Sequence, residues 1–405
     1  MIVRLLLAGL FVVCSGWLSI AVSGASRLRY QSPEAALRLQ PRDARATATV
    51  AAQVLAATRG RVTPEAARRA ADLARQALER DPTVVEAWRT LAIVSTRRGQ
   101  AERLFHFANS LSRRDVPTQI WLIEDAVRRN DIPGALSHYD AALRSNLGSH
   151  QLLMPVLVNA TGERRIVPSL VALLRTRPPW RAAFLSALAE GAPNPDNLVQ
   201  LMTMLGRPSS PEEVQLMSRS INRLVERNAF APALRLYLML ADRPPDGQSL
   251  RNGTFDRPNV YPPLDWQLAD GAEINAEQRP APNSGQERRL YIFASTDARG
   301  QAARQLIFLA PGSYALSARS GRSDLPGPEG LSWRISCASQ PNSLLLDQPA
   351  VPAGPAIRTI SAEFRVPPSG CASQWLTLQI VAGAQPEGTG AWVASVRIEP
   401  ANRSG

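Results

Sequence analysis

The chain has 405 residues, of which 45% are hydrophobic and 20% are charged, so it has the composition of a globular protein and not of a disordered or fibrous one. This length allows two or three domains, each with its own core. The formal net charge is +12, and only three His and three Cys are present, none of them with the spacing of zinc ligands.

The positive charge is unevenly distributed, and every basic residue is Arg. The segment Ser26–Leu250 holds 31 Arg against 21 acidic residues, whereas Arg251–Gly405 holds 14 against 13. Attraction for an acidic polymer or surface is therefore expected in the first segment. The alternative is codon bias, because Arg, Ala, Pro and Gly are all abundant in proteins encoded by GC-rich genomes.

The N-terminal segment is apolar. Leu5–Val22 is eighteen residues without a charge, preceded by Arg4 and followed by Arg27. Its length favours a retained transmembrane helix over residues 1–25, which predicts a single-pass protein of the bacterial inner membrane with its bulk in the periplasm. The alternative is a signal peptide cleaved near Ser23-Gly-Ala25, which leaves a secreted or periplasmic protein. In either case a nucleic-acid partner is not expected.

Helical signals dominate residues 30–245. Thr63-Pro64-Glu65 and Ser210-Pro211-Glu212 each combine a capping hydroxyl, a first-turn Pro and an acidic residue near the positive end of a helix. Gly191 and Gly206 follow apolar runs and indicate helix ends.

Within this segment, Ala66–Val116 resembles a tetratricopeptide repeat. The resemblance rests on the small residues Ala70, Ala74 and Ala77, on a turn at Gly99, and on a step of about 34 residues from Pro82 to Val116. The residues at or near the usual positions of the repeat are Trp88, Leu91, Gly99, Ala108 and Leu111. The resemblance implies a TPR-like α-helical repeat domain built from stacked helix pairs.

In such arrays, partners bind the concave face that the first helix of each pair forms. In the best repeat that face presents four residues, Glu86, Arg89, Ile93 and Arg97. Arg89 and Arg97 are the candidates for contacting an acidic or peptide partner among the envelope proteins. The alternative is that they are solvated residues of an ordinary helix face.

After the linker Pro244–Gly247 the pattern changes to alternation between Gly and Pro turns, which predicts a second domain over residues 250–400. Seven strands are expected: Leu290–Phe293, Gln305–Leu309, Tyr314–Ala318, Leu331–Cys337, Ile360–Val366, Trp375–Val381 and Trp392–Ile398. Short strands at this spacing favour a β-sandwich. The fold class is therefore multidomain, α followed by all-β.

The second domain resembles a carbohydrate-binding jelly roll. The resemblance rests on the motifs Asn252-Gly-Thr-Phe-Asp256, Pro263-Leu-Asp-Trp266, Pro311-Gly-x-Tyr314 and Trp392…Val396-Arg-Ile398. It implies that polysaccharide is the ligand and that Trp rings stack on sugars. Trp266, beside a Pro-rich loop, and Trp375, alternating with polar residues, are the candidate ligand-binding residues, whereas Trp333 and Trp392 are in phase with apolar faces and are expected in the core.

Metal binding is not expected in the second domain. Many such modules have a carboxylate just before the last strand that helps to hold calcium, but here the sequence reads Ala394-Ser395.

Cys337 and Cys371 are expected to form a disulfide outside the cytoplasm, and two buried thiols are the alternative.

Catalysis is not expected. The sequence has no nucleophile elbow, phosphate loop or dinucleotide fingerprint, and no cofactor is implied. Carboxylate pairs for glycoside hydrolysis stay open, because spacing in sequence does not report spacing in space. The sequence favours a non-catalytic, membrane-anchored periplasmic adaptor with a glycan-binding module, in exopolysaccharide secretion or cell-envelope assembly. The alternative is a protein–protein interaction scaffold in which the β-sandwich is structural or binds protein.

Overall fold

The computed structural model describes residues 23, 26–145, 147–241, 250–282, 287–295, 298–322, 330–350, 358–381 and 391–401. The chain forms two compact units, one comprising the residues up to Leu157 together with Ala172–Arg181, the other comprising Val158–Val171 and Ala182 onward. No helix in the described part is long and apolar enough to cross a bilayer. The predicted anchor segment Leu5–Val22 lies outside the described residues.

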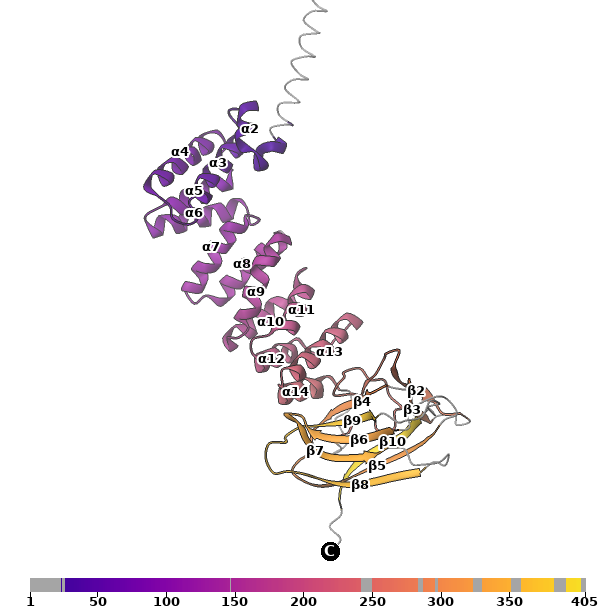
Figure 1. Ribbon diagram of the computed structural model, residues 1–405. Coiled ribbons are helices and arrows are strands. Elements are labelled where there is room, and N and C mark those ends of the chain that lie inside the picture. Colours follow the sequence, from indigo (N-terminus) through magenta and orange to yellow (C-terminus); the bar gives the residue numbers. More distant parts are fainter. Residues whose placement is uncertain are drawn as a thin grey trace, which may run out of the picture. The chain divides into compact units, whose positions relative to one another are not determined.

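The first part of the chain is a series of helices (Figure 1). They are α2 (Pro33–Leu39), α3 (Ala44–Ala56), α4 (Pro64–Arg80), α5 (Val85–Val94), α6 (Arg98–Leu111), α7 (Val116–Arg128), α8 (Ile132–Ser145) and α9 (Leu147–Ala160). Consecutive helices pack in pairs: α3 on α4, α5 on α6 and α7 on α8. This pairing agrees with a helical repeat, while membership of the tetratricopeptide family stays a prediction.

Small side chains line the contacts within these pairs. Ala70, Ala74 and Ala77 of α4 are fully buried, since helices approach closely where their shared face lacks bulk. The expected turn at Gly99 is wrong in detail. The turn between α5 and α6 comes before it, and Gly99 lies in the first turn of α6.

The helix starts follow the capping rule. The side chain of Thr63 accepts a hydrogen bond from the backbone N of Ala66 at 3.2 Å, and that of Ser210 accepts one from Glu213 N at 3.3 Å. Each bond satisfies a backbone donor that the first turn of a helix leaves free.

The later helices are η1 (Arg164–Ile166), α10 (Val167–Arg175), α11 (Arg181–Gly191), α12 (Pro195–Leu205), α13 (Pro211–Glu226) and α14 (Phe230–Leu240). From Ala182 onward the helices belong to the same compact unit as the strands. The helix α14 is joined to the β part by side chains. The hydroxyl of Tyr237 donates to Asp265 Oδ1 at 2.8 Å, and the guanidinium of Arg251 lies 4.5 Å from the centre of the Tyr237 ring.

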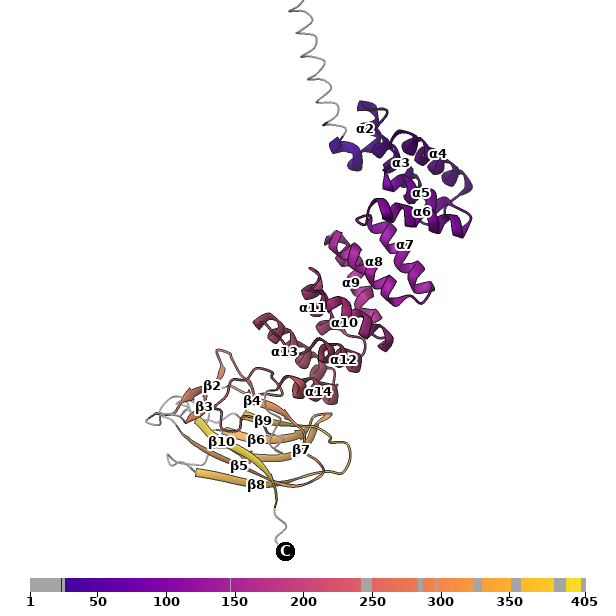
Figure 2. The ribbon, with the colours of Figure 1, turned by 180° about the vertical axis from the view of Figure 1, so that it is seen from behind.

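The β part is a sandwich of two antiparallel sheets (Figures 1 and 2). One sheet has the order β1-β4-β9-β6-β7, and the other has the order β2-β3-β10-β5-β8. The strands are β1 (Gln267–Leu268), β2 (Ile274–Pro280), β3 (Arg288–Ala294), β4 (Gly300–Ile307), β5 (Gly312–Arg322), β6 (Gly330–Cys337), β7 (Gln340–Pro349), β8 (Arg358–Val366), β9 (Gln374–Val381) and β10 (Ala391–Pro400).

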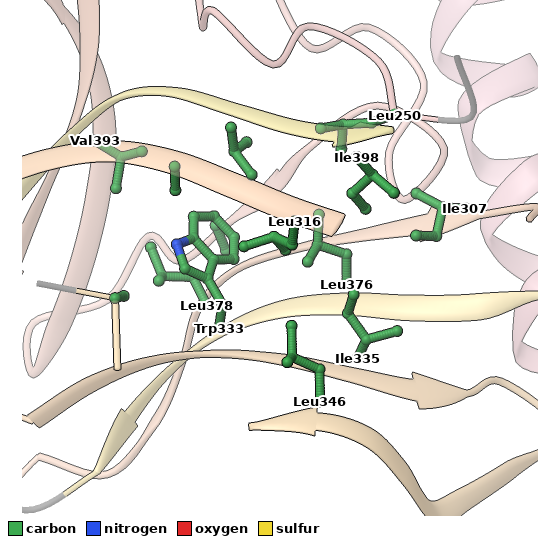
Figure 3. Close-up of a cluster of buried hydrophobic side chains, with 14 of the residues drawn as sticks. Leu250, Ile307, Leu316, Trp333, Ile335, Leu346, Leu376, Leu378, Val393 and Ile398 are labelled. Atoms are coloured by element: carbon green, nitrogen blue, oxygen red, sulfur yellow. The ribbon is translucent and has the colours of Figure 1, made fainter. Parts of the chain in front are cut away.

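The core lies between the two sheets. Figure 3 shows Trp333 of β6 among Leu316 of β5 and Leu376 and Leu378 of β9. All members of this buried cluster fall between Leu250 and Ile398. Both sheets contribute alternate side chains to it, as a half-buried strand requires.

Each of the seven predicted strands has a counterpart, so the β-sandwich is confirmed. Three strands were not predicted: β1, β2 and β7. The prediction that Trp333 lies in the core, in phase with an apolar face, is also confirmed: Leu331, Trp333, Ile335 and Cys337 of β6 are all buried there.

The segment before β1 is fixed by a close approach to β10. The backbone O of Gly253 accepts from Val396 N at 2.8 Å, and a Cβ at residue 253 would lie 2.3 Å from the carbonyl O of Val396. Phe255, two residues later, is fully buried. The glycine of this motif therefore lets the chain cross β10 and place an aromatic ring in the core.

The predicted disulfide is present in the structure. Cys337, at the end of β6, is bonded to Cys371, which precedes β9. The two residues are 34 positions apart and are both buried.

Candidate functional site

A row of polar side chains crosses the sheet β1-β4-β9-β6-β7 on the side away from the core. In β9, Leu376 and Leu378 point into the core, so Thr377 between them faces outward. Its cross-strand partners continue the row over all five strands: Gln267, Arg304, Thr377, Arg334 and Asp347. We call these five residues the polar row.

Hydrogen bonds hold the charged members of the polar row in place. Arg304 Nε donates to Gln267 Oε1 at 2.7 Å, and Arg334 Nε donates to Asp347 Oδ2 at 3.0 Å. Asp347 is exposed, Arg334 is half-buried, and Thr377 between the two arginines is buried. The row therefore presents fixed donors and acceptors, with little side-chain entropy left to lose on binding.

Trp375 lies beside the polar row on the same face. It is half-buried, and its cross-strand partners are Leu306 of β4 and Ser336 of β6. The guanidinium carbon of Arg304 lies 4.8 Å from the centre of its indole ring, within the range of a cation–π contact. Trp375 therefore lies on the outer face of β9, and its assignment as a ligand-binding residue stays a prediction.

Arg304, at the β4 end of the row, is half-buried. Burial lowers the pKa of its guanidinium, and the negative charge of Glu226, at the end of α13, opposes that shift. The end of α13 therefore lies near the β4 side of this face. Access for a ligand is better over β9, β6 and β7, where Gln379, Arg334 and Asp347 retain exposed surface.

A buried hydroxyl belongs to the same face. Ser332 of β6 is the cross-strand partner of Gln379, and it is 7% exposed. Among the residues that the structure describes, its Oγ has no hydrogen-bond partner. Buried polar groups normally have one, so this hydroxyl is a candidate contact for a bound ligand.

Trp266 is not a surface residue. The prediction that its side chain stacks on a sugar is therefore wrong. It is 1% exposed, packs against Phe255 and Trp333, and donates through Nε1 to the backbone O of Asn252 at 3.0 Å. The ring therefore belongs to the core and has no exposed surface on which a sugar could stack. A Trp next to a two-residue strand gives no alternation from which its direction could be read.

Trp392 is buried as expected, but outside the central core. It forms a cluster on the outer side of the second sheet with Tyr291, Ala394 and Phe293. The guanidinium of Arg289 lies 4.0 Å from the centre of its ring. Gly321 makes room for it, because a Cβ there would lie 2.5 Å from the indole.

Two of the four helical candidates serve the fold. Arg89 is 9% exposed and pairs with Glu86 Oε1 at 3.2 Å and with Asp115 Oδ1 at 2.5 Å. These contacts correct the expectation that Arg89 is free for a partner. Ile93 is 48% exposed, and Arg97 is exposed just before α6, so the four residues do not form one polar site.

In the described ranges, no group of three or more His, Cys, Asp or Glu side chains is arranged to hold a metal ion. The polar row itself was not expected from the sequence. The only sequence signal for it is the alternation of Trp375, Thr377 and Gln379 with apolar residues in β9, because the partners of these residues depend on register.

No protein-family model matches the chain. No curated protein matches it either.

Solved structures of carbohydrate-binding modules are among those similar to the chain. One, titled "CBM4 structure and function", is 18% identical, with 38% of this chain and 100% of that chain covered and a TM-score of 0.29. A xylan-binding CBM22-1 domain of Paenibacillus barcinonensis Xyn10C is 9% identical, with 36% and 91% covered and a TM-score of 0.26. TmCBM61 in complex with β-1,4-galactotriose is 13% identical, with 38% and 99% covered and a TM-score of 0.22. Likeness at this level leaves the ligand to be inferred from the side chains of this chain.

Proposed function

We propose that the β-sandwich is a non-catalytic glycan-binding module and that its ligand lies across β9, β6 and β7, on the face that holds the polar row. The observation that carries the proposal is the position of Trp375 beside that row. An aromatic ring can stack on the C–H face of a sugar, while fixed polar groups beside it bond the hydroxyls.

The chemistry of this face suits a polyol. Asp347 supplies carboxylate acceptors, Arg334 supplies planar donors, and the hydroxyl of Ser332 can bond in either direction. The guanidinium of Arg334 also favours a sugar that carries a carboxylate, so acidic polysaccharides are included among the ligands.

We further propose that the helical part binds envelope proteins and that the chain is anchored in the inner membrane by residues 1–25, with its bulk in the periplasm. The apolar run Leu5–Val22 and the excess of Arg in Ser26–Leu250 support this arrangement. A role in exopolysaccharide secretion or envelope assembly follows from joining such a helical part to a glycan-binding module. A structural or protein-binding sandwich is the competing function.

Affinity electrophoresis of the full-length protein through gels that contain neutral or acidic polysaccharides tests the glycan site. Xylohexaose and β-1,4-galactotriose, the ligands named for two of the similar structures, are the first soluble competitors. We expect Trp375→Ala to weaken binding at least about fivefold, because each lost stacking contact costs on the order of 1 kcal/mol or more.

Phe293→Ala is the matched control. Phe293 lies on the outer side of the other sheet, and the guanidinium of Arg279 lies 5.2 Å from its ring centre, as Arg304 lies over Trp375. If both variants lose retardation equally, or if neither loses it, the assignment of the glycan site to the face that holds Trp375 is wrong. If no polysaccharide retards the unmodified protein, the competing function, a structural or protein-binding sandwich, is favoured.

A further inference from the structure

A polar cavity lies between the α6–α7 turn and α8, in the first compact unit. Its volume is about 400 Å³. The side chains that matter for its chemistry are Arg113, Arg114, Gln119, His138, Asp140 and Arg144. With Asn109, two serines and one Ala completing the lining, it has no large apolar side chain, so it suits a small charged ligand better than an apolar one.

Gln119 fixes the orientation of His138. Gln119 is fully buried, and its Nε2 donates to Asn109 Oδ1 at 2.7 Å and to the backbone O of Arg113 at 3.1 Å. Its Oε1 is therefore the acceptor for His138 Nδ1, 2.8 Å away. With Nδ1 carrying the proton, Nε2 of the neutral ring is an acceptor, and it becomes a donor only when the ring is protonated.

The arginines of the cavity have unused donors. Arg113 and Arg114 are exposed, and no side-chain hydrogen bond or ion pair of theirs occurs among the described residues. Arg144 bonds Asp140 through Nε, at 2.8 Å to each carboxylate oxygen, and its two Nη groups bond no described residue. Asp140 also accepts from Trp180 Nε1 at 2.9 Å.

The charges of the cavity do not balance. Three Arg against Asp140 leave two positive charges while His138 is neutral, and three when it is protonated. Guanidinium groups bind the oxygens of phosphate and sulfate through paired hydrogen bonds, and a tetrahedral dianion has the charge that this cavity lacks.

We propose that this cavity binds a tetrahedral dianion, namely a phosphate or sulfate group, between Arg113, Arg114 and the Nη groups of Arg144, and that His138 strengthens binding once its ring is protonated. The site lies in the helical part and does not depend on glycan binding by the sandwich. The ligand is either the free ion or a monoester substituent of a larger molecule.

The surroundings of His138 make this dependence on pH physically consistent. Burial lowers the pKa of His138 from its ordinary value of 6.5. Three positive charges lower this pKa further: those of His106 on α6, Arg113 in the turn and Arg129 after α7. The negative charge of Asp131 raises it and so opposes them. A bound dianion reverses that balance. By linkage, binding that is tighter at low pH must raise the pKa of His138.

The experiment uses the full-length protein and sulfate, which stays a dianion over the whole pH range, so that only the protein titrates. The chain has three His, so each imidazole can be followed by NMR, and His138→Gln assigns the signal. We expect sulfate to raise the pKa of His138 and to bind more tightly at pH 5.5 than at pH 7.5, by up to tenfold for each pKa unit of that rise.

Arg113→Gln with Arg114→Gln is expected to weaken sulfate binding at least about tenfold. The matched control is Arg68→Gln with Arg69→Gln, which removes two adjacent exposed charges from α4 in the same unit. His138→Gln should bind sulfate as the unmodified chain does at pH 7.5 and lose the pH dependence. Comparison of inorganic phosphate with glycerol phosphate separates the free ion from a monoester.

Three results would overturn the proposal. They are an unchanged His138 titration in the presence of sulfate, equal weakening by both double variants, and a larger His138 shift with glucuronate than with sulfate. The last result assigns the cavity to a carboxylate instead.

Discussion

The Nη1 atom of Arg89 lies 2.5 Å from Oδ1 of Asp115, and this ion pair joins α5 to the N-cap residue of α7. The same guanidinium contacts Glu86, which accepts from Thr49 Oγ1 of α3 at 3.0 Å. Asp115 also accepts from Thr118 Oγ1 at 2.5 Å. A continuous polar network therefore links α3, α5 and α7, the first helices of three successive pairs.

Arg89→Met is expected to lower the free energy of unfolding of the helical part by about 3 kcal/mol, because it leaves Glu86 and Asp115 without their shared cation in a largely buried place. Urea unfolding followed by far-UV circular dichroism measures this. Arg97→Met removes an exposed Arg and should change the unfolding free energy by less than about 0.5 kcal/mol. Equal effects would mean that Arg89 is a surface residue.

The strands found from the sequence are those with clear alternation. The three strands missed, β1, β2 and β7, all lie at sheet edges. An edge strand is less covered than an inner one, so its sequence needs fewer apolar residues. Ile274–Pro280 shows this, with Ala276 as its only buried residue.

The sequence did not predict which residues far apart in the chain contact one another. Arg89 was expected on an open helix face, and nothing in the chain indicates that Asp115, 26 residues later, meets it. The polar row was missed for the same reason, because Arg304, Thr377 and Arg334 become neighbours only through strand register.

Trp266 and Trp375 should respond differently to truncation. Trp266→Ala is expected to cost about 3–5 kcal/mol of stability, because it removes a fully buried ring from the core. Trp375→Ala removes a half-buried ring from the outer face and should cost about 1 kcal/mol, mostly the lost contact with Arg304. Thermal unfolding of both variants checks this. A larger loss for Trp375→Ala would place Trp375 in the core and weaken its assignment to the glycan site.

Tyr237 should make the free energy of unfolding depend on pH in the alkaline range. Burial raises the pKa of the Tyr237 hydroxyl well above its ordinary value of 10.0, and the carboxylate of Asp265 adds to the shift. A raised pKa in the folded state means that the unfolded chain releases its proton first. The contribution of Tyr237 is therefore complete below about pH 10 and is lost as the pH rises through and beyond that value.

Tyr237→Phe should accordingly lower stability by about 2 kcal/mol near neutral pH, the usual worth of a hydrogen bond to a charged group. The variant should also lose less stability than the unmodified chain between about pH 9 and pH 11. Urea unfolding at each pH measures both effects. Parallel pH profiles would show that Tyr237 ionises equally in both states.

The disulfide should stabilise the sandwich. Cys337→Ser with Cys371→Ser opens a closed loop of 34 residues and is expected to cost about 3–4 kcal/mol in the chain-entropy model. Reductant should lower the unfolding temperature of the unmodified chain and leave that of the variant unchanged. The chain has three Cys, so denatured, unreduced protein should titrate one thiol, from Cys14, or none if that residue has been cleaved off. Two further titratable thiols would show that the bond does not form, and would argue against an oxidising compartment for this domain.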